Sequence, residues 1–310
     1  MIDLIITVTL NPCIDVSLHI ATFVRGGMNR VVKSRTDVAG KGMNVSVALG
    51  NLGIESACHG INYKDNGAMM DSFLDGLNIK RDFVYSEGAI RTNNKIYEED
   101  SGTMTEINQP GMYAAPELID ELISKIKKAR PDILVMSGSR PAGVGTDVYK
   151  RLMECTDAKT YLDTEGGALR LGIESKNPPY MIKPNLFELE TAYERKFKSR
   201  DEIAEFCLEI NSKGVRYVCV SMGKDGALIT GGEKAFYSPA PNVKAAGVQG
   251  AGDSMVAGMI YAHENHFPME ETLRCGIAAA SASIVREGTQ LCTRECFEEM
   301  LALVDVVELF

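Results

Sequence analysis

A glycine-rich turn that ends in an acidic residue is the stretch of this sequence whose residue types most directly suggest chemistry. It reads Gly250-Ala251-Gly252-Asp253 and leads into an apolar run with a helical pattern. Glycines leave the backbone amides uncovered, so several N–H groups could converge on one anion at the positive end of a helix dipole. A phosphate group suits such a site, and Asp253 could act there as the base for an acceptor hydroxyl.

The same turn also has a purely structural interpretation. Aspartate is a preferred N-cap residue, so Asp253 could serve only to begin the helix. Two other phosphate-binding patterns are excluded. A dinucleotide fingerprint would need glycine where Met255 stands, and no Gly-x-x-x-x-Gly-Lys-Ser/Thr occurs in the chain.

A second glycine-containing turn brings a cation. It runs from Ala39 to Asn44 and includes Lys41, ahead of an expected helix over 44–52. Asn44 could cap that helix or contact a ligand. Together with Arg91, Arg30 and Arg140, Lys41 could supply the local positive charge that an anionic substrate needs. Each arginine alone is more often a solvated surface charge.

The overall composition narrows the classes of partner and compartment. The chain has 310 residues, 45% of them hydrophobic, and a net charge of −9. We therefore expect neither a nucleic acid nor a membrane as its partner, since both call for a basic face or a long apolar span. Its eight cysteines form no Cys-x-x-Cys pair, so we expect reduced thiols and a cytoplasmic location.

Alternating strands and helices should position these residues. Apolar strands separated by helical patterns indicate crossover units in a mainly parallel sheet. Lighter strands at 16–21 and 31–38 and a polar hairpin over 91–107 indicate a second, smaller sheet. The expected main strands are 4–10, 56–60, 132–137, 159–163 and 215–221, with a further extended piece at 83–84 and an edge hairpin at 227–238. The expected helices are 68–77, 116–129, 145–154, 185–195, 200–212, 252–264, 269–286 and 293–304.

Polar motifs follow the main strands at the points where ligands bind in open parallel sheets. Each motif alone is an ordinary turn, but together they favour a site at one edge of the sheet. They span Thr9–Asp15, Ser137–Pro141, Asp163–Gly166, Lys183–Glu188 and Ser221–Gly226.

Seven ordered motifs resemble those of one enzyme family. They are Thr9-Leu-Asn-Pro-x-x-Asp15, Gly40-Lys-Gly-x-Asn44, Arg91-Thr-Asn-x-Lys-Ile96, Ser137-Gly-Ser139, Lys183-Pro-Asn-x-x-Glu-Leu189, Ser221-x-Gly-x-x-Gly226 and Gly250-Ala-Gly-Asp-Ser254. From end to end the chain resembles the PfkB (ribokinase-like) carbohydrate kinases, and most of all the branch of 1-phosphofructokinases and tagatose-6-phosphate kinases. The resemblance implies an α/β fold with a doubly wound, mainly parallel sheet and a small β-sheet lid. It implies one kinase domain over 1–310, with the lid built from about 16–38 and 88–108.

The resemblance also assigns roles to residues. Asp253 would be the general base, and the amides of Gly250, Ala251 and Gly252 would hold the transferring phosphoryl group. The ATP-binding residues would be Lys183, Asn185, Ser221, Gly223, Gly226 and Gly252. Asn185 and Glu188 would position Mg²⁺ through water. The substrate-binding residues would be Asp15, Gly40, Lys41, Asn44, Arg91, Ser139 and Arg140.

Three positions depart from the family pattern. Ala39 stands where a glycine is usual, Arg140 where a small apolar residue is usual, and Val248-Gln249 where a Thr or Ser is usual. Arg140 would place an extra guanidinium near the sugar pocket, either as a phosphate ligand or in a surface ion pair. Because these changes surround the expected substrate, they bear on which sugar the protein accepts.

We expect an ATP-dependent kinase that converts fructose 1-phosphate to fructose 1,6-bisphosphate, with ATP and Mg²⁺. Alternatives in the same class are a tagatose-6-phosphate kinase and a kinase of another sugar or a nucleoside. A catalytically silent nucleotide or sugar-phosphate sensor, or an NAD-dependent oxidoreductase, would represent other classes. Exposed edges of the lid invite strand pairing, so we also expect a homodimer through the lid.

Overall fold

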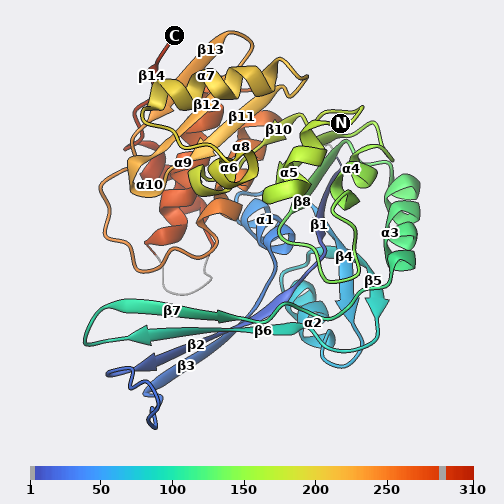
Figure 1. Cartoon of the computed structure of the whole chain (residues 1–310), viewed down its shortest axis with the longest axis vertical. Helices are drawn as coiled ribbons and strands as arrows, with labels where there is room; N and C mark the ends of the chain where they lie inside the picture. Colours follow the sequence, from blue (N-terminus) through green and yellow to red (C-terminus); the bar gives the residue numbers. More distant parts are fainter. Residues whose placement is uncertain (1–3, 286–290) are drawn as a thin grey trace.

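The computed structural model describes residues 4–285 and 291–310. Helices cover both faces of a ten-stranded sheet, and a separate four-stranded sheet projects from one side of this body (Figure 1). The expected α/β fold, with a doubly wound, mainly parallel sheet and a small attached sheet, is confirmed. Within the described part of the chain, no helix combines the length and the apolar character needed to cross a membrane.

The main sheet is parallel through its central strands and antiparallel at one edge. From β11 to β5 all neighbours run parallel, whereas β12, β13 and β14 pair antiparallel. In spatial order the strands are β14 (Val307–Glu308), β13 (Lys234–Ser238), β12 (Ala227–Gly231), β11 (Tyr217–Ser221), β10 (Met181–Ile182), β9 (Lys159–Asp163), β8 (Ile133–Ser137), β1 (Ile5–Thr9), β4 (Ala57–Tyr63) and β5 (Lys80–Ser86).

Two hydrophobic cores lie on opposite faces of this sheet. Successive residues of β8 alternate between them, because side chains of a strand point to opposite faces. Leu134 belongs to one core and Val135 to the other. The helices are α1 (Lys41–Asn51), α2 (Ala68–Gly76), α3 (Pro116–Ala129), α4 (Val148–Met153), α5 (Gly166–Ile173), α6 (Leu186–Tyr193), α7 (Arg200–Asn211), α8 (Ala251–Glu264), α9 (Met269–Ile284) and α10 (Arg294–Leu301), with a 3₁₀ turn at Gly223–Asp225.

The smaller sheet, called the lid sheet below, has the order β3-β2-β6-β7. Its strands are β2 (Cys13–Ile20), β3 (Lys33–Ala39), β6 (Arg91–Glu98) and β7 (Thr103–Asn108). β2 and β6 run parallel, with Asp15 opposite Asn93. The expected light strands and the polar hairpin are therefore confirmed. Figure 1 shows the lid sheet extending away from the main body.

Helix α1 corrects one expectation at its start. It begins at Lys41, three residues before the expected position, and Gly40 is its N-cap. Asn44 therefore lies inside the helix, and its interpretation as a cap is wrong. The Thr9 side chain supports the early start, since its hydroxyl accepts a hydrogen bond from the Met43 amide and satisfies one of the free N–H groups of the first turn.

Three short elements escaped sequence analysis. Helix α5 contains Gly166, Gly167 and Gly172, whose low helix propensity indicates a turn. Burial of Leu169 and Ile173 in the core overrides that propensity. Strands β10 and β14 have only two residues each, too few to produce an alternating pattern. The expected helix 269–286 ends at Ile284, and residue 286 lies outside the described residues.

Candidate active site

A cavity of about 500 Å³ opens between the ends of the main strands and the lid sheet. The loop after β1, the first turn of α1, the loop after β8, the lid sheet and the start of α8 all contribute to its wall. The lining residues include Thr9, Asn11, Asp15, Gly40, Lys41, Asn44, Arg91, Asn93, Lys95, Ser139, Gln249, Gly250 and Asp253. Expected site residues from five separate motifs, together with Glu188 from a sixth, therefore meet in one place.

Asp253 lies at the bottom of this cavity and is only 5% exposed. Helix α8 has Gly250 as its N-cap, so the interpretation of Asp253 as a helix cap is wrong. Its carboxylate oxygen Oδ2 instead accepts a hydrogen bond of 2.8 Å from Asn44 Nδ2. Burial raises the pKa of Asp253 to about 6, against the opposing influence of Lys41. Near neutral pH the group is therefore mostly ionised and able to accept a proton.

The turn before α8 requires glycine at position 250, and Gly252 lies beside a lysine. Gly250 has φ +71, a conformation that other residues rarely adopt, and a Cβ there would lie 2.4 Å from Leu291 Cδ2. A Cβ on Gly252 would lie 3.4 Å from Lys183 Nζ, which places this ammonium group beside the turn. Backbone amides and a buried cation therefore adjoin one another, as an anionic ligand requires.

Two lysines and two carboxylates alternate next to the turn. Asp163 is buried and lies 3.3 Å from Lys183 Nζ and 3.6 Å from Lys41 Nζ. Burial alone raises the pKa of Asp163, but these lysines outweigh it and hold the pKa below its usual range. Lys41 Nζ also lies 3.8 Å from Glu188 Oε1, and the Asp163 carboxylate raises the pKa of Lys41. Lys41 therefore remains charged.

The two residues assigned to Mg²⁺ form the start of α6. Asn185 is its N-cap and accepts a hydrogen bond from the Glu188 amide, while Glu188 Oε2 accepts one from the Asn185 amide. This reciprocal pair is a capping box. Asn185 Oδ1 is thus occupied, whereas Glu188 also lines the cavity. The described residues contain no group of three His, Cys, Asp or Glu that could enclose a metal.

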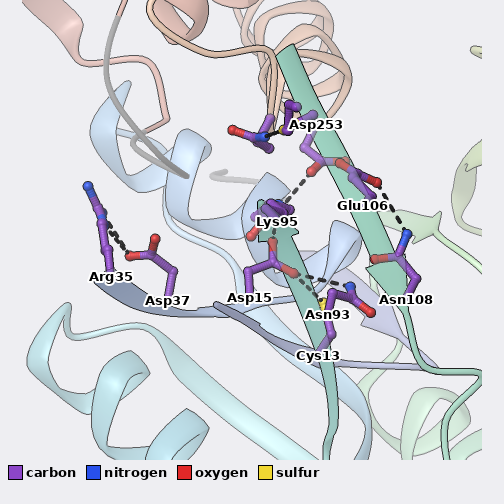
Figure 2. A network of polar contacts seen from close by, with 12 residues as sticks. Cys13, Asp15, Arg35, Asp37, Asn93, Lys95, Glu106, Asn108 and Asp253 are labelled. Atoms are coloured by element: carbon purple, nitrogen blue, oxygen red, sulfur yellow. Dashed lines mark hydrogen bonds and ion pairs between the residues drawn. The ribbon is translucent and has the colours of Figure 1, made fainter. Parts of the chain in front are cut away.

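Asp15 lies on the lid sheet with partners on the neighbouring strand (Figure 2). Its carboxylate accepts hydrogen bonds from Asn93 Nδ2 at 3.1 Å and from Lys95 Nζ at 2.5 Å. The Cys13 thiol donates a third at 3.4 Å. Because Lys95 is buried with it, Asp15 stays paired at the wall of the cavity.

Of the remaining residues expected to bind the substrate, some line the cavity and one does not. Ser139 lines the cavity and accepts a hydrogen bond from Asn11 Nδ2. Arg91 also lines it and donates through Nη1 to the Gln109 carbonyl, while its buried Nε has no partner. Arg140 is exposed, donates to the Val144 carbonyl and is not among the cavity-lining residues. The structure therefore does not bring Arg140 to this site.

The residues assigned to ATP lie partly outside this cavity. Asn185, Ser221 and Gly223 line a second hollow of about 900 Å³. The Ser221 amide donates to the Pro184 carbonyl, which joins this hollow to the Lys183 segment. Gly226 is not in its lining, but it has φ +86 and a Cβ there would lie 2.0 Å from the Ser238 carbonyl oxygen. It therefore shapes the turn between β11 and β12.

Sequence analysis assigned no role to three residues that prove central. Asp163 was noticed only as part of a polar motif at a strand end. Asn93 and Lys95 lie two residues apart on the expected hairpin, so strand alternation could have placed both on one face. The sequence indicated that these strands form one small sheet, but the register of β2 with β6, which brings Asn93 and Lys95 to Asp15, has no signal in a single sequence.

Comparisons with known proteins cover nearly the whole chain. A model of the pfkB family of carbohydrate kinases matches residues 6–296. The 1-phosphofructokinase of Borreliella burgdorferi is 33% identical, covering 99% of both chains, and that of Bacillus subtilis is 32% identical, covering 99% of this chain and 100% of the relative. The solved structure of phosphofructokinase-2 from Escherichia coli in complex with fructose-6-phosphate has a TM-score of 0.89 at 27% identity, covering 97% of this chain and 99% of that chain.

Proposed function

Since the chain belongs to the pfkB family of carbohydrate kinases and is a phosphotransferase acting on a hydroxyl group, we propose that it phosphorylates fructose 1-phosphate with ATP. The products are fructose 1,6-bisphosphate and ADP. One observation carries the proposal. Asp253, a buried carboxylate with a pKa of about 6, follows a glycine turn and lines the cavity. Arg91 lines the same cavity, and its Nε has no hydrogen-bond partner.

Asp253 acts as the general base in this proposal. The primary hydroxyl oxygen of the sugar attacks the γ-phosphorus, the bond from that phosphorus to the ADP oxygen breaks, and the hydroxyl proton passes to the carboxylate. The hydrogen bond from Asn44 orients the carboxylate and stabilises its ionised form. The ionised base is thus ready before substrate binds.

The glycine turn and Lys183 stabilise the charge on the transferring group. Residues 250–252 form the N-cap and the first turn of α8, where backbone amides lack partners within the helix, and the Lys183 ammonium lies beside Gly252. Such fixed donors favour the transition state because they need no reorganisation. Mg²⁺ would neutralise charge on the phosphates, and the Glu188 carboxylate fits a contact through water, since Mg²⁺ keeps several waters and needs few protein ligands.

Arg91 is the group best suited to the phosphate already present on the sugar. Lys41 has two carboxylate neighbours and Lys95 is paired with Asp15, whereas Arg91 retains a buried N–H without a partner. A guanidinium binds phosphate through several donors at once. Asp15 then accepts hydrogen bonds from sugar hydroxyls, and the nucleotide extends towards Ser221 and Gly223.

A direct assay of ADP release tests this function. Mg-ATP is offered with fructose 1-phosphate, tagatose 6-phosphate, fructose 6-phosphate, fructose, ribose and adenosine. We expect the highest kcat/KM with fructose 1-phosphate, and a loss of about 10²- to 10⁴-fold in kcat for Asp253→Asn. Asp305→Asn, an exposed substitution of the same kind, is the control.

Other outcomes assign other functions. Preference for tagatose 6-phosphate or an unphosphorylated sugar overturns the proposed substrate but keeps the kinase. Binding of ATP without turnover on any acceptor indicates a silent sensor. Full activity of Asp253→Asn refutes the role of this carboxylate as the base.

A further inference from the structure

Gln249 joins the glycine turn to the lid sheet. It directly precedes Gly250, and its Nε2 donates a hydrogen bond of 2.8 Å to Tyr97 Oη on β6. The same Nε2 lies 3.2 Å from Met104 Sδ on β7. One side chain therefore contacts two strands of the lid sheet from the residue next to the turn. A displacement of the lid must either move this turn or break these contacts.

The other side of Tyr97 is held as well. Its ring stacks on His19 of β2, with centroids 4.8 Å apart and planes at 11°. His19 Nδ1 in turn lies 2.6 Å from Glu99 Oε1. The Tyr97 hydroxyl is thus presented to Gln249 by a ring whose position is fixed within the lid sheet. The hydrogen bond between Gln249 and Tyr97 therefore joins the loop to a tyrosine that other residues already hold in place.

Gln249 also has one polar atom left over. Its Oε1 is buried and has no hydrogen-bond partner, although the residue lines the cavity. A buried acceptor without a hydrogen bond is unfavourable, so such an atom calls for a donor. The donors that a sugar substrate brings into this cavity are hydroxyl groups. A hydroxyl that reached Oε1 would complete the hydrogen bonding of the amide.

We propose that Gln249 is a positioning and specificity residue that engages the lid and the sugar together: Nε2 holds Tyr97, and Oε1 accepts a hydrogen bond from a substrate hydroxyl. This inference rests on the proposed function, because it takes the ligand of the cavity to be a sugar. Binding of the sugar then stabilises the closed position of the lid and fixes the residue that begins the phosphoryl site.

The test is a double-mutant cycle read by steady-state kinetics. Gln249→Met keeps the length of the side chain and removes both polar atoms, and Tyr97→Phe removes the hydroxyl but keeps the stacked ring. We expect Gln249→Met to lower kcat/KM for the sugar about tenfold, mainly through KM, with KM for ATP unchanged. We expect Tyr97→Phe to lower it by a smaller factor, and the double variant to resemble Gln249→Met, because the two share one interaction.

Matched controls are Val248→Met and Tyr113→Phe. Val248 adjoins Gln249 in the same loop, but it is exposed and is not among the cavity-lining residues, contrary to the expectation that it lies near the substrate; Tyr113 is an exposed tyrosine outside the lid sheet. Both should match the wild type. The inference is overturned if kcat/KM of Gln249→Met for the sugar stays within about twofold of the wild type, or if this variant raises KM for ATP as much as KM for the sugar. It is also overturned if the losses of kcat/KM in Gln249→Met and Tyr97→Phe multiply in the double variant.

A second measurement separates this inference from the proposed function. If the wild type phosphorylates no sugar, the proposed function fails, and the role of Oε1 fails with it. The Tyr97 contact is then tested by amide hydrogen exchange over 91–108 in the protein without ligand. Faster exchange in Gln249→Met and Tyr97→Phe than in Val248→Met supports the contact, and equal rates overturn it.

Discussion

Replacing Asn44 with leucine should shift the pH dependence of the reaction. Asn44 Nδ2 donates the 2.8 Å hydrogen bond to Asp253, and this bond holds the pKa of Asp253 below the value that burial alone would give. A hydrogen bond to a charged group contributes about 1.5–3 kcal/mol, and one pKa unit corresponds to about 1.4 kcal/mol. Removing the bond should therefore raise the pKa by about one to two units, from about 6 to about 7–8.

The direction of the effect on the rate follows from the protonation state of Asp253 that the reaction requires. The proposed mechanism needs the ionised carboxylate, so a higher pKa lowers the active fraction at neutral pH and leaves it unchanged at high pH. At pH 7 the ionised fraction falls about two- to tenfold, whereas at pH 9 it changes by about a tenth or less. If Asn44 also contacts the substrate, the loss of that contact lowers the rate by a similar factor at pH 7 and at pH 9.

The assay is kcat/KM for the sugar phosphate from pH 5.5 to 9, by direct ADP detection. Asn51→Leu is the matched control, since Asn51 lies on the same helix and bonds the Cys292 carbonyl instead. We expect the ratio of Asn44→Leu to wild type to rise with pH, and that of Asn51→Leu to stay flat. A ratio for Asn44→Leu that is the same at pH 6 and pH 9 refutes the reasoning.

Two further predictions concern the turn and the lid. Gly250→Ala forces a Cβ to within 2.4 Å of Leu291 Cδ2 at φ +71, so we expect a loss of stability of about 1–3 kcal/mol and at least a tenfold lower kcat, measured by thermal melting and turnover. Gly50→Ala, with open space around it, is the control, and an unchanged Gly250→Ala contradicts the prediction. The β2–β3 connection exposes apolar side chains, with Val32 77% exposed, so we expect a homodimer through the lid that Val32→Asp shifts towards monomer. Sedimentation velocity measures this, with Leu303→Asp as the control, and a monomeric wild type rules it out.

Sequence patterns predicted the main elements well because they reflect local physics. Helix α3 has the expected bounds, with a proline at its first turn and an apolar stripe that includes Leu122 and Ile126. The first strand is apolar throughout since it is buried on both faces. Helix α5 was missed because its glycines oppose helix formation and only tertiary packing stabilises it.

The site was predictable where a motif carries its own chemistry, and less so where residues meet across the fold. Asp253 and the glycine turn stand together in the sequence, and the turn that ends at Asn44 was noticed from its glycines and Lys41, while the family resemblance implied its role in substrate binding. The contact of Asn44 with Asp253 joins residues 209 positions apart, and no spacing rule reveals it. The ion pair of Lys95 with Asp15 depends in the same way on the pairing of two distant strands.

The connections of the lid sheet limit how this protein can be re-engineered. Only Gly40 separates the end of β3 from the start of α1, the helix that carries Lys41 and Asn44. Gly40 packs closely against strand β1, because a Cβ there would lie 2.7 Å from Thr9 Cγ2. Transplanting a lid from another kinase would therefore also reset the register of α1. A chimera should exchange the lid together with that helix, so that the base keeps its hydrogen-bond donor.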